Sequence, residues 1–401
     1  MDISYKNLST FSIFDSYPKH LKQKLLTRCF NAGRDDIVLD RCCGAMIGLA
    51  YGDFIGAPVE FLPAENSSSV VQLVHTVKDT KVITSLKYSD LRGFDGMKPG
   101  QWTDDTSMGL CMADSLILKK KFDGTDMRLR FWNWWHCGYN NAFRFDEQQH
   151  SVGLGGNISK SLIFSMGEIP GPIFTPKTGH NDSGNGSIMR LAPVPIYYHR
   201  KPFDIVRKYA ELSSRTTHPG NDAAEACAFM SYLIVNAINR THNYTHKKLT
   251  PIQFFLESMA SSFHTTNANL QKLLEGMQTK KSTEYSWNWR EPEIKIVETL
   301  ENRGNKYDGF PVSRGYYGSY CMDGLAVALN ALYNTSTFDQ AVLKTVNMLG
   351  DADSTGSICG QIAGAFYGFS TTNPHFYQLL KQWDNDEILL RAVILYDEST
   401  N

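Results

Sequence analysis

The chain has 401 residues, of which 42% are hydrophobic, 12% aromatic and 20% charged, a composition typical of a globular protein and not of a disordered chain. Its 40 Lys and Arg residues balance 41 Asp and Glu residues, and the formal net charge of −1 argues against nucleic acid or an anionic membrane surface as a partner. The first residues lack a basic head followed by an apolar run, and we recognise no stretch of about 20 apolar residues, so we expect neither a secretory signal nor a membrane span.

The cysteines indicate the redox state of the compartment in which the protein resides. Eight of them are scattered along the chain without a CxxC pair, whereas zinc sites and disulfide frameworks use closer, paired spacing. We therefore expect buried free thiols in a reducing compartment, and an intracellular, cytoplasmic protein.

Residues 1–40 read as a polar N-terminal extension with one helix near 20–31. From residue 41 the sequence becomes apolar and rich in glycine, "RCCGAMIGLAYGDFIGAPVEF", and glycines recur every four residues from Gly44 to Gly56. Interior glycine costs a helix about 1 kcal/mol relative to alanine, but glycines at i, i+4 form a smooth stripe that another backbone can approach closely. The segment "DADSTGSICGQIAGAFYG" at 351–368 has the same four-residue glycine spacing. We predict two closely packed central helices; the alternative is that these segments are loops.

Helical periodicity dominates the rest of the chain, and only 79–89 resembles a strand. Segments rich in Gly, Asn and Ser predict loops at 144–160, 170–188 and 302–319. We therefore expect one all-α domain over 41–398. The further predicted helices cover 108–117, 126–143, 221–238, 251–263, 321–332, 338–349 and 385–396.

The stretch "GQWTDDTS" at 100–107 places Asp104 and Asp105 side by side at the start of an apolar helix. One reading is helix capping, because Thr or Asp satisfies the first N–H groups and acidic residues suit the positive end of the helix dipole. One Asp is sufficient for that purpose. A pair flanked by threonines forms a dense cluster of hard oxygens.

A second cluster, "GDADST" at 350–355, again precedes a small-residue helix and supplies Asp351 and Asp353. Each cluster alone is compatible with capping, but four carboxylates that converge in a core need cations, since buried charge must be paired or coordinated. Carboxylate and hydroxyl ligands without His or Cys favour Mg²⁺ or Mn²⁺ over Zn²⁺. A two-metal site of this kind orients substrate and activates water.

These motifs, taken in order, resemble the ADP-ribosylglycohydrolase family, which includes dinitrogenase reductase-activating glycohydrolases and ADP-ribosylarginine and ADP-ribosylserine hydrolases. The resemblance covers roughly 41–370 and implies an all-α, compact orthogonal helical domain around a binuclear centre with two Mg²⁺ or Mn²⁺ ions. It rests on "GAMIGLAYGDFIGAPVEF", "WTDDTSM", "GNGSIMRLAPVPIYY", "SSRTTHPGNDAAEACAF" and "GDADSTGSICGQIAGAFYG".

The resemblance also assigns roles to residues. It implies that Glu60 is the mobile glutamate that reaches the metals and the ribose; Glu60 alone reads as an exposed acid after a proline turn. For the base that deprotonates the attacking water, the candidates are Asp351 and Asp353. Ser354 stands where many relatives have Thr, which keeps the hydroxyl. The implied metal ligands are Thr103, Asp104, Asp105, Asp351, Asp353 and Ser354.

Further positions match the family's substrate-binding loops. The loop "SVGLGGN" at 151–157 offers bare N–H groups that can cradle a diphosphate, although glycine loops usually only turn. A His before Pro is by itself more often a loop or capping residue, and "FWNWW" at helical spacing reads as packing. The implied substrate-binding residues are Gly153, Gly155, Gly156, Asn185, Gly186, Ser187 and His218.

The expected function is therefore metal-dependent hydrolysis of the bond between ADP-ribose and a protein side chain, with arginine favoured, in a monomer whose partner is an ADP-ribosylated protein. The alternatives are a catalytically silent relative that binds ADP-ribose or has a structural role, and a hydrolase of serine-linked or O-acetyl-ADP-ribose. From the site alone, a metal-dependent phosphoesterase is also open. The 1–40 extension and the insertion-like 264–312 lie outside the match and leave substrate selectivity open.

Overall fold

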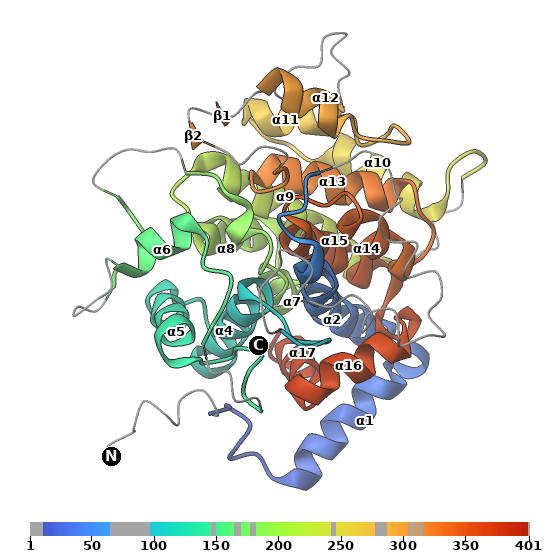
Figure 1. The fold of residues 1–401 in the computed structure, drawn as a ribbon. Coiled ribbons are helices and arrows are strands. Elements are labelled where there is room, and N and C mark those ends of the chain that lie inside the picture. Colours follow the sequence, from blue (N-terminus) through green and yellow to red (C-terminus); the bar gives the residue numbers. More distant parts are fainter. Residues whose placement is uncertain are drawn as a thin grey trace.

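The fold is built almost entirely from helices (Figure 1). The computed structural model describes residues 11–64, 97–145, 150–163, 170–176, 182–241, 246–276, 287–303, 306–307, 310–311 and 316–399. Within them, the one ladder pairs β1 (Lys306–Tyr307) with β2 (Phe310–Pro311) in antiparallel register. The expected all-α class is confirmed. The predicted strand at 79–89 lies outside the described residues.

The longer helices, in chain order, are α1 (Lys19–Asp35), α2 (Ile37–Gly56), α4 (Asp104–Lys119), α5 (Gly124–Cys137), α8 (Phe203–Arg215), α9 (Asn221–Asn239), α10 (Pro251–Ser262), α13 (Cys321–Tyr333), α15 (Ala352–Tyr367), α16 (Pro374–Asp384) and α17 (Glu387–Glu398). The shorter helical elements are η2 (Ala57–Val59), α6 (Gly156–Ile163), η4 (Asn185–Ser187), α7 (Pro193–Tyr198), α11 (Ala268–Glu275), α12 (Ile296–Arg303), α14 (Phe338–Val346) and η5 (Phe369–Thr371).

Helices α2 and α15 lie side by side at the centre of the molecule (Figure 1). Their glycine stripes face each other in antiparallel order, with Gly48 against Gly360 as the middle contact. A Cβ atom added at either residue would lie under 3.0 Å from the carbonyl group of the other. The predicted pair of closely packed central helices is therefore confirmed. The facing pairs are Gly44 with Gly364, Gly48 with Gly360, Gly52 with Gly356 and Gly56 with Ala352.

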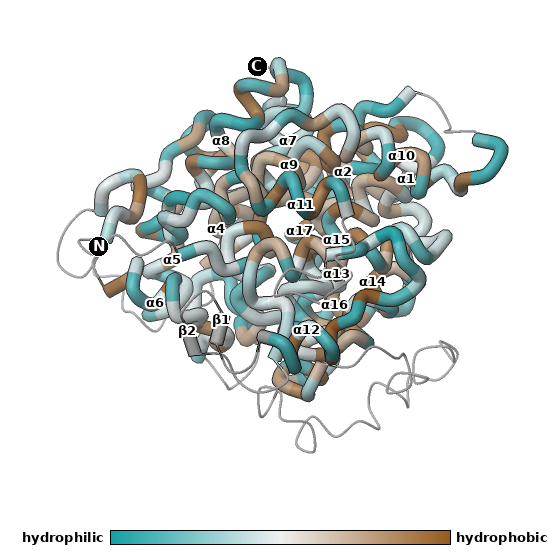
Figure 2. Tube along the Cα trace, turned by 90° about the horizontal axis from the view of Figure 1, so that it is seen from above, coloured by the Kyte–Doolittle hydropathy of each residue, from teal (hydrophilic) through white to brown (hydrophobic). Residues whose placement is uncertain are grey.

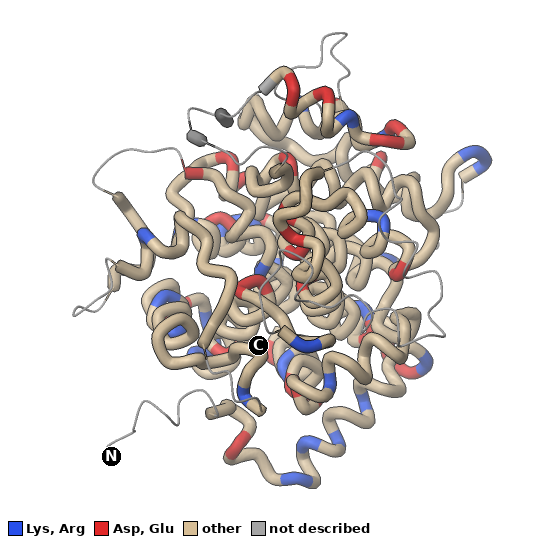
Figure 3. The backbone as a smooth tube through the Cα atoms, viewed as in Figure 1, with Lys and Arg blue, Asp and Glu red and all other residues tan. Residues whose placement is uncertain are grey.

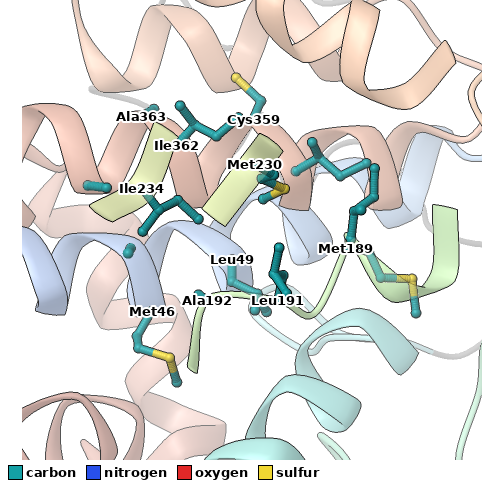
Figure 4. Packing of buried hydrophobic residues seen from close by; sticks show 14 of the residues in the cluster. Met46, Leu49, Met189, Leu191, Ala192, Met230, Ile234, Cys359, Ile362 and Ala363 are labelled. Atoms are coloured by element: carbon teal, nitrogen blue, oxygen red, sulfur yellow. The ribbon is translucent and has the colours of Figure 1, made fainter. Parts of the chain in front are cut away.

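The remaining helices wrap this pair. Helices α9, α13 and α14 pack on α15, and α1, α4 and α17 pack on α2. Hydrophilic segments dominate the outline of the molecule, and apolar segments lie mostly within it (Figure 2). Figure 4 shows part of the buried hydrophobic cluster, to which Met46 and Leu49 of α2, Met230 and Ile234 of α9 and Ile362 of α15 all belong. All eight cysteines are buried and unpaired, as expected.

One described helical stretch, residues 37–59, is long and apolar enough to cross a bilayer. The expectation that no run reaches this length is therefore wrong for α2. Within the molecule, however, 94% of its most apolar window is buried. A helix enclosed by others on all sides is apolar all round, so its central position accounts for the hydropathy.

A helix prediction and a loop prediction need correction. The predicted helix at 126–143 ends as α5 at Cys137, because Gly138 adopts a left-handed conformation with φ of 73° and terminates it. The predicted loop at 144–160 contains the start of α6, which begins at Gly156. Helix α1 packs on α2 and α17, and since α2 begins at Ile37, the sequence-based boundary at residue 41 falls within that helix.

Replacing Gly48 by Ala should lower the free energy of unfolding by about 1–3 kcal/mol, because the new methyl group overlaps the α15 backbone. In an exposed helix the same change would stabilise the protein by about 1 kcal/mol. The sign of the change in unfolding free energy therefore shows whether helix packing or helix propensity dominates at this position. Chemical denaturation measures it. Gly171→Ala is the control, since its added Cβ would meet nothing closer than 3.8 Å and the change should stay within about 0.5 kcal/mol. A stabilised Gly48→Ala protein would contradict the close approach.

Candidate active site

The antiparallel contact of α2 and α15 brings the C-terminal end of α2 beside the N-terminal end of α15, and α4 also packs against both helices. Acidic positions accordingly lie at the centre of the molecule as well as on its outside (Figure 3). A cavity of about 530 Å³ opens there, with Glu60, Asp104, Asp351 and Asp353 in its wall. The two acidic clusters of the sequence therefore meet at one cavity.

Asp53 of α2 fixes the start of α4. Its carboxylate accepts hydrogen bonds from the backbone N–H of Thr103 at 2.9 Å and of Thr106 at 2.9 Å, and from their hydroxyl groups at 2.8 and 2.7 Å. Thr103 itself makes no side-chain cap, so the orphan N–H groups of α4 are satisfied from another helix. Sequence reasoning missed Asp53. The signal was a carboxylate inside an otherwise apolar, glycine-striped helix.

A first acidic group consists of Asp53, Asp105 and Asp353, each of which offers an oxygen within 4.8 Å of the others. All three side chains are buried. The hydroxyl of Thr103 reaches Asp105 Oδ2 at 3.2 Å and Asp353 Oδ2 at 3.4 Å. The two sequence motifs are therefore in direct contact through Thr103. Asp105 and Thr103 lie below the cavity surface, and Asp353 is part of it.

A second group, Glu60, Asp351 and Asp353, also has oxygens within 4.8 Å of one another. Asn185 donates its amide to Asp351 Oδ2 at 2.9 Å and to the carbonyl of Gly318 at 2.9 Å. This contact orients one carboxylate oxygen of Asp351. Asp353 belongs to both groups and therefore joins them.

The donor set of these groups fits divalent cations. Burial and the neighbouring carboxylates raise the pKa of Asp105, Asp353 and Glu60 well above the usual range. Asp105 Oδ1 and Glu60 Oε2 are buried and make no hydrogen bond to any residue that the structure describes. Such buried, repelling oxygens are the arrangement that a hard cation stabilises. The geometry is thus consistent with two adjacent metal positions.

The remaining ligand candidates, Asp104 and Ser354, line the cavity but belong to neither three-carboxyl group. Burial and the charge of Asp53 raise the pKa of Asp104 well above its usual range. Ser354 donates its backbone N–H to Asp353 Oδ1 at 2.8 Å, and its hydroxyl lies 3.6 Å from Met189 Sδ.

The glycine loop lies against the acidic cluster. Gly153 has φ of 90°, and an added Cβ would overlap the carboxylate of Asp104, so this position requires glycine. A Cβ at Gly155 or Gly156 would meet no such obstacle. Both line the cavity, where α6 begins and its first N–H groups lack intrahelical partners. The loop thus presents backbone donors to a ligand.

His218 forms a second wall. An added Cβ at Gly186 would lie 2.9 Å from His218 Cε1, so glycine makes room for the ring. Thr217 Oγ1 contacts His218 Nδ1 at 2.8 Å and accepts a hydrogen bond from Arg190 at 2.6 Å. Burial and the charge of Arg190 lower the pKa of His218 well below its usual range, which keeps the ring neutral. Ser187 is not among the described lining residues; its hydroxyl accepts from Ser214 at 3.0 Å beneath the wall.

Comparison with known proteins gives a consistent answer. The family model described as ADP-ribosylglycohydrolase matches residues 34–400. The ADP-ribosylarginine hydrolase Tri1 of Serratia proteamaculans (strain 568) is 28% identical over 349 residues, covering 86% of this chain and 76% of that protein. The ADP-ribosyl-[dinitrogen reductase] glycohydrolase of Rhodospirillum rubrum is 26% identical, covering 82% and 87%.

More distant relatives agree. The Homo sapiens ADP-ribosylhydrolase ARH3 is 22% identical, covering 88% of this chain and 93% of that protein. A solved structure titled "ADP-ribosylglycohydrolase-related protein complex" superposes with a TM-score of 0.61 at 26% identity, covering 90% of this chain and 99% of the other. The match therefore spans sequence and fold over most of the chain.

Replacing Asp53 by Asn should destabilise the protein by about 1–3 kcal/mol, because one carbonyl oxygen cannot accept the four bonds that the carboxylate accepts and an amide N–H then faces backbone donors. Thermal or chemical unfolding measures the loss. Asp123→Asn is the matched control, since Asp123 is an ordinary N-cap that accepts one bond from Asp126 N at 3.0 Å and Asn caps equally well. Equal effects of the two substitutions would show that Asp53 is only a cap.

Proposed function

The chain belongs to the ADP-ribosylglycohydrolase family and is a hydrolase; on that premise we propose that it removes ADP-ribose from arginine side chains of proteins with two bound Mg²⁺ or Mn²⁺ ions. The observation that carries the proposal is the pair of joined carboxylate groups with unpartnered oxygens at a cavity of about 530 Å³. The similarity to proteins named as ADP-ribosylarginine hydrolases favours the arginine linkage.

The metal pair would be held by the oxygens of both motifs. Asp353 belongs to both groups and would contribute oxygens to either, and Asp53 adds a carboxylate to the first group. When bound, the ions would supply Lewis acidity toward the ribose hydroxyls and would acidify water. The proposed ligands are Thr103, Asp104, Asp105, Asp351, Asp353 and Ser354.

The side chains of the second group are placed to handle protons. Tyr316 donates its hydroxyl to Glu60 Oε1 at 3.2 Å, which leaves Oε2 of Glu60 to accept a hydrogen bond from a ribose hydroxyl. Asn185 holds Asp351 Oδ2, and we assign Asp351 as the base that takes a proton from the attacking water. These roles require both carboxylates to be ionised, which bound cations favour.

The reaction then balances without a strong acid. The water oxygen bonds to C1″ of the ribose, its proton passes to Asp351, and the C1″–N bond breaks with its electron pair on the guanidine nitrogen. Because the modified guanidinium is already a cation, it departs as a neutral guanidine and takes up a proton afterwards. The products are free ADP-ribose and unmodified arginine. The backbone donors near Gly153 and the neutral His218 are placed to bind the diphosphate and the distal nucleoside.

Metal binding should raise thermal stability. At a hundredfold excess of free ion over its Kd, each site contributes about 2.7 kcal/mol to the free energy of unfolding, so Mn²⁺ or Mg²⁺ should raise Tm and EDTA should reverse the shift. Asp351→Asn should lose most of the metal-dependent shift and abolish turnover. Asp397→Asn, which alters the partner of Arg28 in a half-exposed ion pair, serves as control. Wild-type turnover and metal response in Asp351→Asn would overturn the assignment.

The linkage is tested by release of ADP-ribose from arginine-linked and serine-linked ADP-ribosyl peptides, each with Mg²⁺ and with EDTA. We expect metal-dependent release from the arginine peptide, at least about tenfold faster than from the serine peptide, because the charged guanidinium leaves without an acid. Chromatography of the products identifies the bond that is cut. AMP with ribose phosphate would indicate a phosphoesterase, and no product together with no metal binding would indicate a silent relative.

A further inference from the structure

An aromatic pair stands beside the acidic cluster, and apart from the hydroxyl of Tyr316 it has no part in the chemistry described above. The rings of Phe61 and Tyr316 stack with centroids 5.5 Å apart and planes inclined by 17°. Both residues line the cavity. Phe61 is 45% exposed, although a large apolar ring would gain from burial. An exposed ring at the wall of a substrate cavity is a candidate surface for part of the substrate.

The backbone holds Phe61 in a conformation that costs energy. Its φ of 65° lies in the left-handed region, where a bulky residue is a genuine outlier. Two backbone hydrogen bonds fix the segment: Phe61 N–H donates to the carbonyl of Gly350 at 3.0 Å, and Gly350 N–H donates to the carbonyl of Leu62 at 2.9 Å. Gly350 is followed by Asp351, so these bonds hold the backbone of Phe61 beside the segment that carries the proposed base.

The pair lies on the side of Glu60 and not on the side of the glycine loop. Tyr316 contacts Glu60 through its hydroxyl, and Phe61 is the next residue in the chain. The glycine loop packs instead on Asp104, and Gly184 and Gly186 pack on His218. If the glycine loop and His218 bind the nucleotide, the aromatic pair faces the group attached to C1″.

The electrostatics select a cation for that position. Five carboxylates line the cavity, against Lys160 as the one Lys or Arg among the described lining residues, and Lys160 is itself 3.6 Å from Asp182. Even with two divalent cations bound, the six carboxyl groups of the two motifs, Asp53 and Glu60 leave excess negative charge when ionised. A flat, delocalised cation gains both from this field and from stacking on an aromatic face.

We propose that Phe61, supported by Tyr316, is a specificity-determining platform that stacks on the guanidinium of the ADP-ribosylated arginine. The inference rests on the proposed arginine linkage and adds the residues that recognise the acceptor. A planar guanidinium matches the exposed ring in shape and charge, whereas the small neutral oxygen of a serine or acetyl linkage offers neither. The platform holds the acceptor while the carboxylates act at C1″.

The test compares two ligands on the same protein: ADP-ribosyl-arginine as substrate, and free ADP-ribose, which lacks the acceptor, as competitive inhibitor. Phe61→Leu keeps an unbranched Cβ and removes the ring. It should raise KM for ADP-ribosyl-arginine about fivefold, the loss expected for an exposed cation–π contact, and leave the inhibition constant of ADP-ribose within about twofold. The ratio of the two constants does not depend on the fraction of protein that is folded.

Two further variants define the outcome. Phe30→Leu changes another exposed ring, 48% exposed and outside the described cavity lining, and should alter neither constant. Tyr316→Phe keeps the stack but removes the hydrogen bond to Glu60, so it should lower kcat without raising the KM ratio. Equal changes of KM and inhibition constant in Phe61→Leu, or no change in either, would overturn the platform while leaving the arginine linkage intact. Failure of the wild-type protein to cleave ADP-ribosyl-arginine would instead overturn the proposed function first.

Discussion

The contact between the glycine stripes of α2 and α15 determines where every acidic side chain of the site lies. Carbonyl groups of one helix occupy the space that side chains would need on the other, as at Gly48 and Gly360. Each glycine weakens its own helix by about 1 kcal/mol, and the close approach offsets this through dispersion contacts along the whole interface. Because the stripes run antiparallel, the end of α2 meets the start of α15.

That position has an electrostatic consequence. Asp53 comes from α2, Asp105 from α4 and Asp353 from α15, and their oxygens converge within 4.8 Å. Burial raises the pKa of all three groups; the neighbouring carboxylates raise it further at Asp105 and Asp353, whereas hydrogen bonds from Thr103 and Thr106 lower it at Asp53. If divalent cations bind here as proposed, their binding energy adds to the folding energy. On the proposed metal site, packing and metal binding act on the same three helices.

The sequence was sufficient for the central helices and for the two acidic motifs, because both are local patterns: a four-residue glycine spacing and carboxylates at helix starts. It was not sufficient for contacts that only the fold creates. Tyr316 contacts Glu60 across 256 residues, and nothing in its local sequence indicates a cavity wall. Asp53 was overlooked because a single acid in an apolar helix has no spacing signal. Helix α6 was overlooked because adjacent glycines such as Gly155 and Gly156 usually indicate a turn. Only the fold shows that they start a helix and expose their backbone to the cavity.

The cavity is built from two kinds of wall, and the difference bears on how the site recognises its ligands. On one side, Gly153 and Gly186 present backbone and leave room for neighbouring groups; such a wall recognises a phosphate or a sugar through N–H donors and tolerates few substitutions. On the other side, Phe61 and Tyr316 present side chains, which mutation can exchange without altering the packing of α2 on α15. The side formed by Phe61 and Tyr316 can therefore change while the carboxylates between the two sides stay in place. If Phe61 and Tyr316 recognise the acceptor as proposed, the chemistry is tied to the glycine stripes, and selectivity for the linkage is tied to these two side chains.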